Sequence, residues 1–294
     1  MLAPSQPEPS HRPLIAVAAA TLATAGGIGW LLQRIWKSKG DKKQRAAQAL
    51  GAGAAVLCLS VALDSGLEHY RGRFKDPVMF VGPAMALLGL AATAWIAFRP
   101  GAARDRLARI AFASVAATGL IGLGFHSYNI LKRPGELSAL NLFYGAPAGA
   151  PAALSLAGLY GLLAGEMIGE RPVPARLPGQ VAALISFSLA GTIAEAGLLH
   201  FRGAFQDPMM YAPVTIPPLA ALAIGAAALF PRAATAAEPL LKATAVLGIA
   251  GPLFHAYGIH RNMGGWRNWS QMILQGPPLP APPAFTGIAI AGLG

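Results

Sequence analysis

Apolar stretches alternate with short polar loops rich in Gly and Pro along this sequence. Residues 14–33 contain no charged side chain and are long enough to cross a hydrocarbon core of ~30 Å. The same pattern predicts nine membrane-spanning helices, at 14–33, 46–69, 77–98, 107–130, 146–168, 179–200, 208–230, 239–259 and 281–294. The last stretch is too short to span a membrane, so we expect its helix to be incomplete in this sequence. The pattern predicts an all-α, polytopic transmembrane helix bundle.

The chain contains an internal repeat. The segment at 67–80 (LEHYRGRFKDPVMF) matches that at 198–211 (LLHFRGAFQDPMMY) at eight of fourteen positions, with an offset of 131 residues. GFHSY at 124–128 matches LFHAY at 253–257, and a pattern of Gly and Pro around 145–151 recurs at the first offset. Three blocks in one order indicate a duplicated unit.

The repeat divides the predicted spans into three parts. These are an N-terminal helix with a basic loop (1–45), a first four-helix repeat (46–171) and a second, incomplete one (179–294). An even number of helices per repeat brings both copies into the membrane in the same direction. Matching residues then lie at the same depth, and the matched blocks fall at the outer ends of the helices.

Composition and charge agree with lipid as the solvent. Hydrophobic residues make up 54% of the chain and charged residues 12%, with a mean hydropathy of +0.50, whereas soluble domains carry about a quarter charged residues. The net charge of +11 is concentrated in predicted loops such as 34–45 and 99–109, as in cytoplasmic loops of membrane proteins. We therefore expect a multi-pass protein of the inner (plasma) membrane with its N-terminus outside, and no nucleic-acid partner.

Four of the six histidines belong to the repeat, namely His69, His126, His200 and His255. They are predicted at the outer ends of the first and third helix of each half. Imidazole is the commonest metal ligand and the usual axial ligand of haem b, and helical bundles build such sites from facing helices. The histidines therefore predict haem b or a non-haem metal such as iron or copper. Pairing within each half, convergence of all four, and interfacial hydrogen bonding without a ligand stay open.

Two carboxylates and two arginines also recur. Asp64 matches Glu195 within the apolar segments, where ionisable groups are costly and are candidates for function. They are candidate metal ligands or parts of a proton or quinone path. Arg71 and Arg202 are candidates for contact with a cofactor, through a propionate group, or with a quinone. Glu68 shares a helical stripe with Asp64 and Arg71, so ion pairing is the alternative.

Turn chemistry explains part of the repeated block. Gly72 and Gly203 are predicted to end helices, and the Asp-Pro pairs at 76–77 and 207–208 are predicted to start the next ones.

The sequence contains no nucleotide-binding loop, hydrolase elbow, zinc-protease motif or covalent haem-attachment motif. The leading hypothesis is an integral membrane redox subunit that exchanges electrons with quinone and a periplasmic redox protein. Intramembrane carboxylates also fit a transporter. A non-catalytic anchor or assembly subunit for a periplasmic partner is the third possibility.

Overall fold

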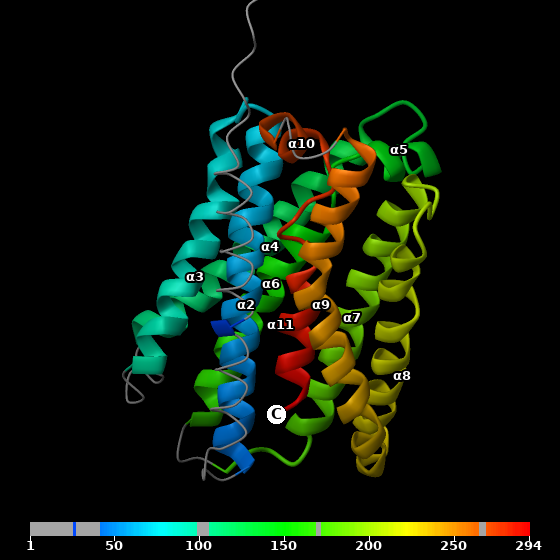
Figure 1. Ribbon diagram of the computed structural model, residues 1–294. Coiled ribbons are helices and arrows are strands. Elements are labelled where there is room, and N and C mark those ends of the chain that lie inside the picture. The colour runs from blue at the N-terminus through cyan, green and yellow to red at the C-terminus, as the bar shows by residue number, and fades with distance from the viewer. Residues whose placement is uncertain (1–25, 28–41, 99–105, 169–171, 265–268) are drawn as a thin grey trace, which may run out of the picture.

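A computed structural model describes residues 26–27, 42–98, 106–168, 172–264 and 269–294 of the chain. These residues form helices and connecting segments without strands, and seven of the helices are long and apolar enough to cross a membrane (Figure 1). The prediction of an all-α polytopic bundle is confirmed, and the chain is a multi-pass membrane protein. The predicted span at 14–33 lies, except for residues 26–27, outside the described residues.

The helices follow the predicted spans closely in the described part of the chain. In order they are α2 (Lys42–Arg71), η1 (Pro77–Phe80), α3 (Val81–Phe98), α4 (Arg106–Leu131), α5 (Ala139–Tyr144), α6 (Gly149–Ile168), α7 (Leu177–Arg202), η3 (Pro208–Val214), α8 (Ile216–Leu229), η4 (Pro231–Ala233), α9 (Ala234–Asn262), α10 (Trp269–Gln275) and α11 (Pro283–Gly292). The short helices α5 and α10 were not predicted, because six or seven residues give no long apolar run.

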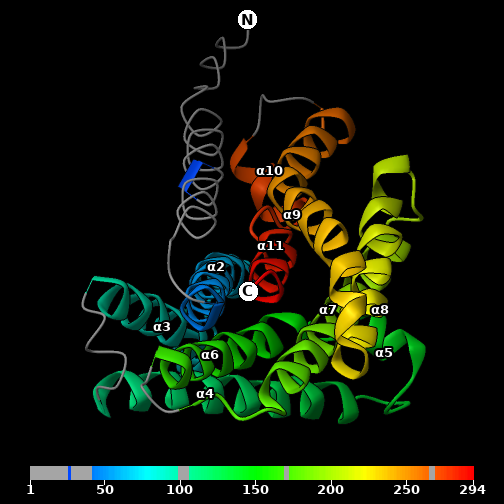
Figure 2. The ribbon, with the colours of Figure 1, turned by 90° about the horizontal axis from the view of Figure 1, so that it is seen from below.

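Two groups of four helices pack side by side, as the view along the bundle shows (Figure 2). In the first group, α2 and α4 both pack against α3 and α6. In the second, α7 and α9 both pack against α8 and α11. Contacts between α2 and α11, and between α6 and α7, join the two groups. The domain boundaries assigned from the sequence stay a prediction.

Corresponding helices make the same close contact in each group. Gly119 of α4 lies so near the backbone of Ser155 in α6 that a Cβ atom would overlap it, and Gly248 of α9 lies in the same way against Thr286 of α11. The Ser155 hydroxyl donates to a carbonyl oxygen of α4 (3.2 Å), and the Thr286 hydroxyl donates to one of α9 (2.8 Å). Small residues and hydroxyl groups are the usual means of helix packing in membranes.

The core lies where the two groups meet. Residues 285–291 of α11 are all buried, as α11 packs between α2, α7 and α9. Tyr160 of α6 is fully buried and donates a hydrogen bond from its hydroxyl to Ser188 of α7 (2.9 Å). Large apolar side chains such as Phe98 and Phe187 are instead 87% and 75% exposed. An apolar exterior of this kind is suited to lipid rather than water.

Candidate functional site

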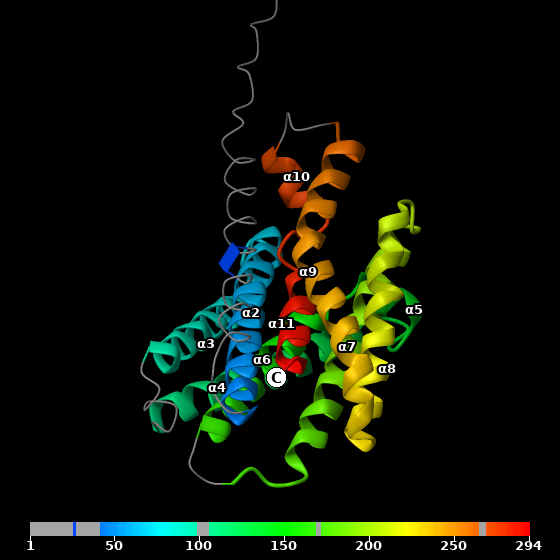
Figure 3. The same cartoon turned by 60° about the horizontal axis from the view of Figure 1, so that its bottom comes forward.

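The repeat-related histidines all lie near the C-terminal ends of transmembrane helices. His69 and His200 stand in the last turns of α2 and α7, while His126 and His255 lie within the last two turns of α4 and α9. These four helix ends are at the end of the bundle that carries α5 and α10, here called the α5/α10 end (Figures 1 and 3). The predicted placement of the histidines at one end of the bundle is confirmed.

The first histidine of each half is fixed by the turn that follows its helix. The Nδ1–H of His69 donates to the carbonyl oxygen of Met79 (2.5 Å), and that of His200 donates to Met210 (2.8 Å). A carbonyl oxygen can only accept, so the bond places the proton on Nδ1 of each ring. The same ten-residue loop closes on its histidine in both copies.

Matched aromatic residues shape this turn. Phe74 and Phe205 have positive φ angles of 44° and 45°, which side-chain-bearing residues seldom adopt. Their N–H groups donate to the carbonyl oxygens of His69 (2.9 Å) and His200 (3.1 Å). Each phenyl ring lies edge-on to its histidine, with centroids 6.1 and 6.2 Å apart. The turn therefore holds the histidine ring from two sides.

The predicted turn residues have the expected roles, with one difference. Asp76 and Asp207 accept hydrogen bonds from backbone N–H groups two residues later, which confirms them as N-caps. Helix α7 ends at Gly203, but its φ of −81° is not left-handed. The left-handed residues follow it, and Gly203 leaves room for the Met210 side chain, whose methyl group would lie 2.8 Å from an added Cβ.

The second histidine of each half is fixed by a loop preceding α6 or α11. His126 donates from Nδ1 to the carbonyl oxygen of Pro147 (2.5 Å), and His255 donates to that of Pro278 (2.8 Å). All four histidines thus donate Nδ1–H to a backbone carbonyl, and no described residue hydrogen-bonds to an Nε2 atom. Metal-ligating histidines have this arrangement, because the bonded nitrogen fixes the ring and the other nitrogen is free to coordinate.

The histidines come together in pairs within each half. The ring centroids of His200 and His255 are 6.2 Å apart, with an interplanar angle of 76°. His69 and His126 are near enough for an electrostatic interaction, but they make no ring contact of the kind that His200 and His255 make. Among the described residues, no three His, Cys, Asp or Glu side chains gather into a metal-binding group. A single site of four histidines and two carboxylates is therefore not formed in this structure.

The two intramembrane carboxylates lie where the halves meet, yet their partners differ. Glu195 of α7 accepts a hydrogen bond from the backbone N–H of Gly149, at the start of α6 (2.8 Å). Asp64 of α2 has a buried Oδ1 with no hydrogen-bond partner among the described residues. The residue 131 positions after Gly149 is Pro280, which has no N–H to donate. The two carboxylates are nevertheless near enough to interact electrostatically.

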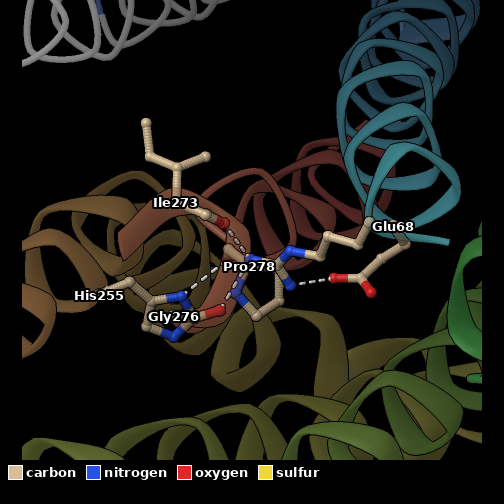
Figure 4. A network of polar contacts seen from close by, with 6 residues as sticks. Glu68, His255, Ile273, Gly276 and Pro278 are labelled. Carbon is tan, nitrogen blue, oxygen red and sulfur yellow. Dashed lines mark hydrogen bonds and ion pairs between the residues drawn. The ribbon is translucent and has the colours of Figure 1, made fainter. Parts of the chain in front are cut away.

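The two arginines also differ. Arg71 forms the predicted ion pair with Glu68 (2.5 Å), and it donates to the backbone carbonyls of Ile273 and Gly276, the latter at 2.8 Å (Figure 4). Arg202 is exposed and lies over the ring of Tyr144, 5.3 Å from its centroid. Arg71 therefore binds Glu68 and two backbone carbonyls, whereas Arg202 binds neither. Contact of either arginine with a cofactor or a quinone stays a prediction.

Backbone groups are the part of the site that the side-chain patterns did not reveal. The carbonyl oxygens of Met79, Met210, Pro147 and Pro278 orient the histidines, but any residue type supplies a carbonyl. The signal was present in the repeat itself, because Met79 matches Met210 and Pro147 matches Pro278. Ser60, which donates to the carbonyl oxygen of Pro280 (2.6 Å), gave no such signal, because the residue at its matched position is Gly191.

Comparison with protein-family models, with curated proteins and with solved structures finds no match to this chain.

Proposed function

We propose that this protein is an integral membrane redox subunit in which each half of the bundle binds one haem b through its own histidine pair. His69 and His126 would hold the haem in the first half, and His200 and His255 would hold the haem in the second. The observation that carries this proposal is the donation of all four Nδ1–H groups to backbone carbonyls, which leaves four Nε2 atoms for coordination.

The number of ligands favours haem over a bare metal ion. A structural or catalytic metal ion held by protein alone needs three or four ligands, and the described residues offer no group of three. Haem iron needs only one or two protein ligands, because the porphyrin supplies the others. The rings of His200 and His255 already lie side by side, with centroids 6.2 Å apart, so these two imidazoles would hold one haem iron together.

The surroundings of the pairs support an electron-transfer role. Both pairs lie at the α5/α10 end of the bundle, and the bias of Lys and Arg toward the opposite loops supports an outer position for this end. A haem there would supply one-electron chemistry between a quinone in the bilayer and a periplasmic redox protein. The chain's part is to hold the imidazoles in one tautomer, to cover them with helix ends, and to present this face to the partner.

The visible absorption spectrum of the detergent-purified protein tests this proposal, recorded as isolated and after dithionite. A Soret band that shifts on reduction, with sharp α and β bands, is the expected result. A featureless spectrum from protein expressed with ample haem supply contradicts it. His69→Ala and His200→Ala should each alter the spectrum, whereas His260→Ala, at the one other histidine that the structure describes, should leave it unchanged.

A second candidate function, a proton-coupled transporter, is favoured by one observation. Asp64 has a buried Oδ1 with no hydrogen-bond partner among the described residues, and the carboxylate is near enough to Glu195 to interact with it electrostatically. Intramembrane carboxylates at the interface between repeats are typical coupling groups. In this case Asp64 is the proton-carrying residue.

Proteoliposomes loaded with a pH-sensitive dye test the second candidate. Under an imposed potassium diffusion potential, the transporter account expects proton uptake by the wild-type protein and its loss in Asp64→Asn. Proton flux equal to that of empty liposomes, or flux unchanged in Asp64→Asn, excludes this role for Asp64.

A further inference from the structure

The loop between α10 and α11 (residues 276–282, here the α10–α11 loop) carries the hydrogen-bond acceptor of His255. The carbonyl oxygen of Pro278 accepts the Nδ1–H of His255 at 2.8 Å. The loop belongs to the second half of the chain, yet its backbone is bound from the first. Figure 4 shows this network around Glu68, Gly276 and Pro278.

Helix α2 holds the α10–α11 loop at both of its ends. Arg71 donates to the carbonyl oxygens of Ile273 and Gly276, five and two residues before Pro278. Ser60 donates to the carbonyl oxygen of Pro280, two residues after it (2.6 Å). These bonds connect residues more than 200 positions apart in the sequence. The carbonyl that orients His255 therefore lies between two anchors from the opposite half.

The Arg71 anchor has the features of a strong contact. Its side chain is only 17% exposed, and Glu68 pairs with the guanidinium at 2.5 Å. The carbonyls of Ile273 and Gly276 lie at the C-terminal end of α10, where carbonyl groups have no partner within the helix. A charged donor makes a stronger bond to such a group than a neutral one does. Arg71 thus fixes both the end of α10 and the start of the loop.

We infer that Arg71 is a positioning residue for His255, so that the first half of the protein sets the ligand geometry of the second. Arg71 acts on the α10–α11 loop, the loop places the carbonyl oxygen of Pro278, and this oxygen holds the His255 ring with its proton on Nδ1. His255 presents Nε2 for coordination only while this sequence of contacts is intact. The functional consequence rests on the proposed haem site, but the contacts and the tautomer do not.

The matching arginine provides the control. Arg202 stands 131 residues after Arg71, has the same charge and lies at the end of the corresponding helix. Its side chain is exposed and contacts the ring of Tyr144, whereas the described contacts of Arg71 include two backbone carbonyls. Neutralising Arg202 therefore removes one positive charge at the same end of the bundle without releasing the α10–α11 loop.

Nitrogen NMR of ¹⁵N-histidine-labelled protein without haem tests the inference, with His255 assigned from the signals lost in His255→Gln. Wild-type protein should show His255 as the single Nδ1–H tautomer. Arg71→Gln should convert this signal to a mixture of tautomers, and Arg71→Lys should restore it in part. Arg202→Gln should leave it unchanged, and His126 should keep one tautomer throughout, as an internal reference.

An unchanged single tautomer of His255 in folded Arg71→Gln overturns the inference. If Arg71→Gln does not fold, Ser60→Ala releases the other end of the loop and should give the same mixture; an unchanged tautomer there overturns it equally. Because the measurement uses protein without haem, its outcome is independent of whether haem binds. In haem-loaded protein, Arg71→Gln should shift the midpoint potential of the haem held by His255 by more than Arg202→Gln does, because Arg202→Gln changes only a nearby charge.

Discussion

Two of the hydrogen bonds that join the halves use the same position of the repeat, Gly149 and Pro280, in opposite ways. Where α7 meets α6, the side chain of Glu195 accepts a hydrogen bond from the N–H of Gly149. Where α2 meets the segment before α11, the side chain of Ser60 donates to the carbonyl oxygen of Pro280, the matched residue. The matched segments are in contact in both copies. The direction of the hydrogen bond differs, because Pro280 has no N–H to donate and Ser60 supplies a donor.

This difference separates what the copies share from what distinguishes them. The histidine turns recur with the same hydrogen bonds and the same ring contact in both copies. The hydrogen bonds between the halves do not recur. The charged residues near them also differ in their partners and in their exposure. Asp64 lacks the donor that Glu195 has, and Arg71 is largely enclosed while Arg202 is exposed. The contacts inside one half therefore match those inside the other, whereas the contacts between the halves do not follow the repeat.

The largest effect is expected at the helix contact that both halves share. Gly119→Leu and Gly248→Leu each force a side chain against the backbone of a neighbouring helix. Overpacking typically costs about 1–3 kcal/mol, and a backbone obstacle places these variants at the upper end or beyond. Unfolding in mixed micelles of SDS and a mild detergent should show that the two variants lose similar amounts of unfolding free energy. A large difference between these two losses would show that the halves differ in their internal helix packing as well as in the contacts between them.

The next effect should separate the two carboxylates. Glu195→Ala leaves the N–H of Gly149 without its acceptor, which costs about 1–3 kcal/mol for a buried donor. Asp64→Ala removes an oxygen that has no partner, so we expect a change within about 0.5 kcal/mol or a gain in stability. Glu195→Gln keeps an acceptor oxygen and serves as the control. Equal destabilisation by Glu195→Ala and Asp64→Ala in the same unfolding assay contradicts the asymmetry.

A smaller effect is expected at the contact between α6 and α7. Tyr160→Phe removes the hydroxyl that donates to Ser188 while keeping the buried ring. The net loss for such a bond is about 1 kcal/mol. Ser188→Ala should cost a similar amount, and the double variant should cost less than the sum of both. Strict additivity of the three unfolding free energies would show that the bond contributes nothing.

A small effect is also expected at Arg202. Its contact with the ring of Tyr144 is exposed, and such cation–π pairs contribute about 0.5–1 kcal/mol. Arg202→Gln should therefore change the unfolding free energy by less than Arg71→Gln does, measured under the same conditions. The reverse order would remove the distinction between the enclosed and the exposed arginine.

The sequence predicted the parts of this molecule that depend on side-chain type. Apolar runs located the seven described spanning helices, the repeat identified the four histidines, and the stripe through Glu68 and Arg71 predicted their ion pair. The pairing of histidines within each half did not follow from the sequence, because helix neighbours are set by packing. The acceptors of the Nδ1–H groups are backbone carbonyls, which leave no mark on residue type.

The sequence pattern also could not predict that the Oδ1 atom of Asp64 has no hydrogen-bond partner among the described residues. Asp64 and Glu195 match in sequence, and nothing near either of them signals different partners. The difference comes from Pro280, more than 200 residues after Asp64, which has no N–H where Gly149 has one. The structure reveals this difference, because it shows that the start of α6 and the segment before α11 make matching contacts with the opposite half.

Haem stoichiometry of the purified protein tests the central claim, that each half carries its own site, most directly. Haem extracted as its pyridine complex should amount to two per wild-type chain. It should fall to one in His69→Ala and in His200→Ala, and to none when both are replaced. One haem per wild-type chain that is lost on replacing a histidine in either half would contradict the account, because a single shared site would then be made by both.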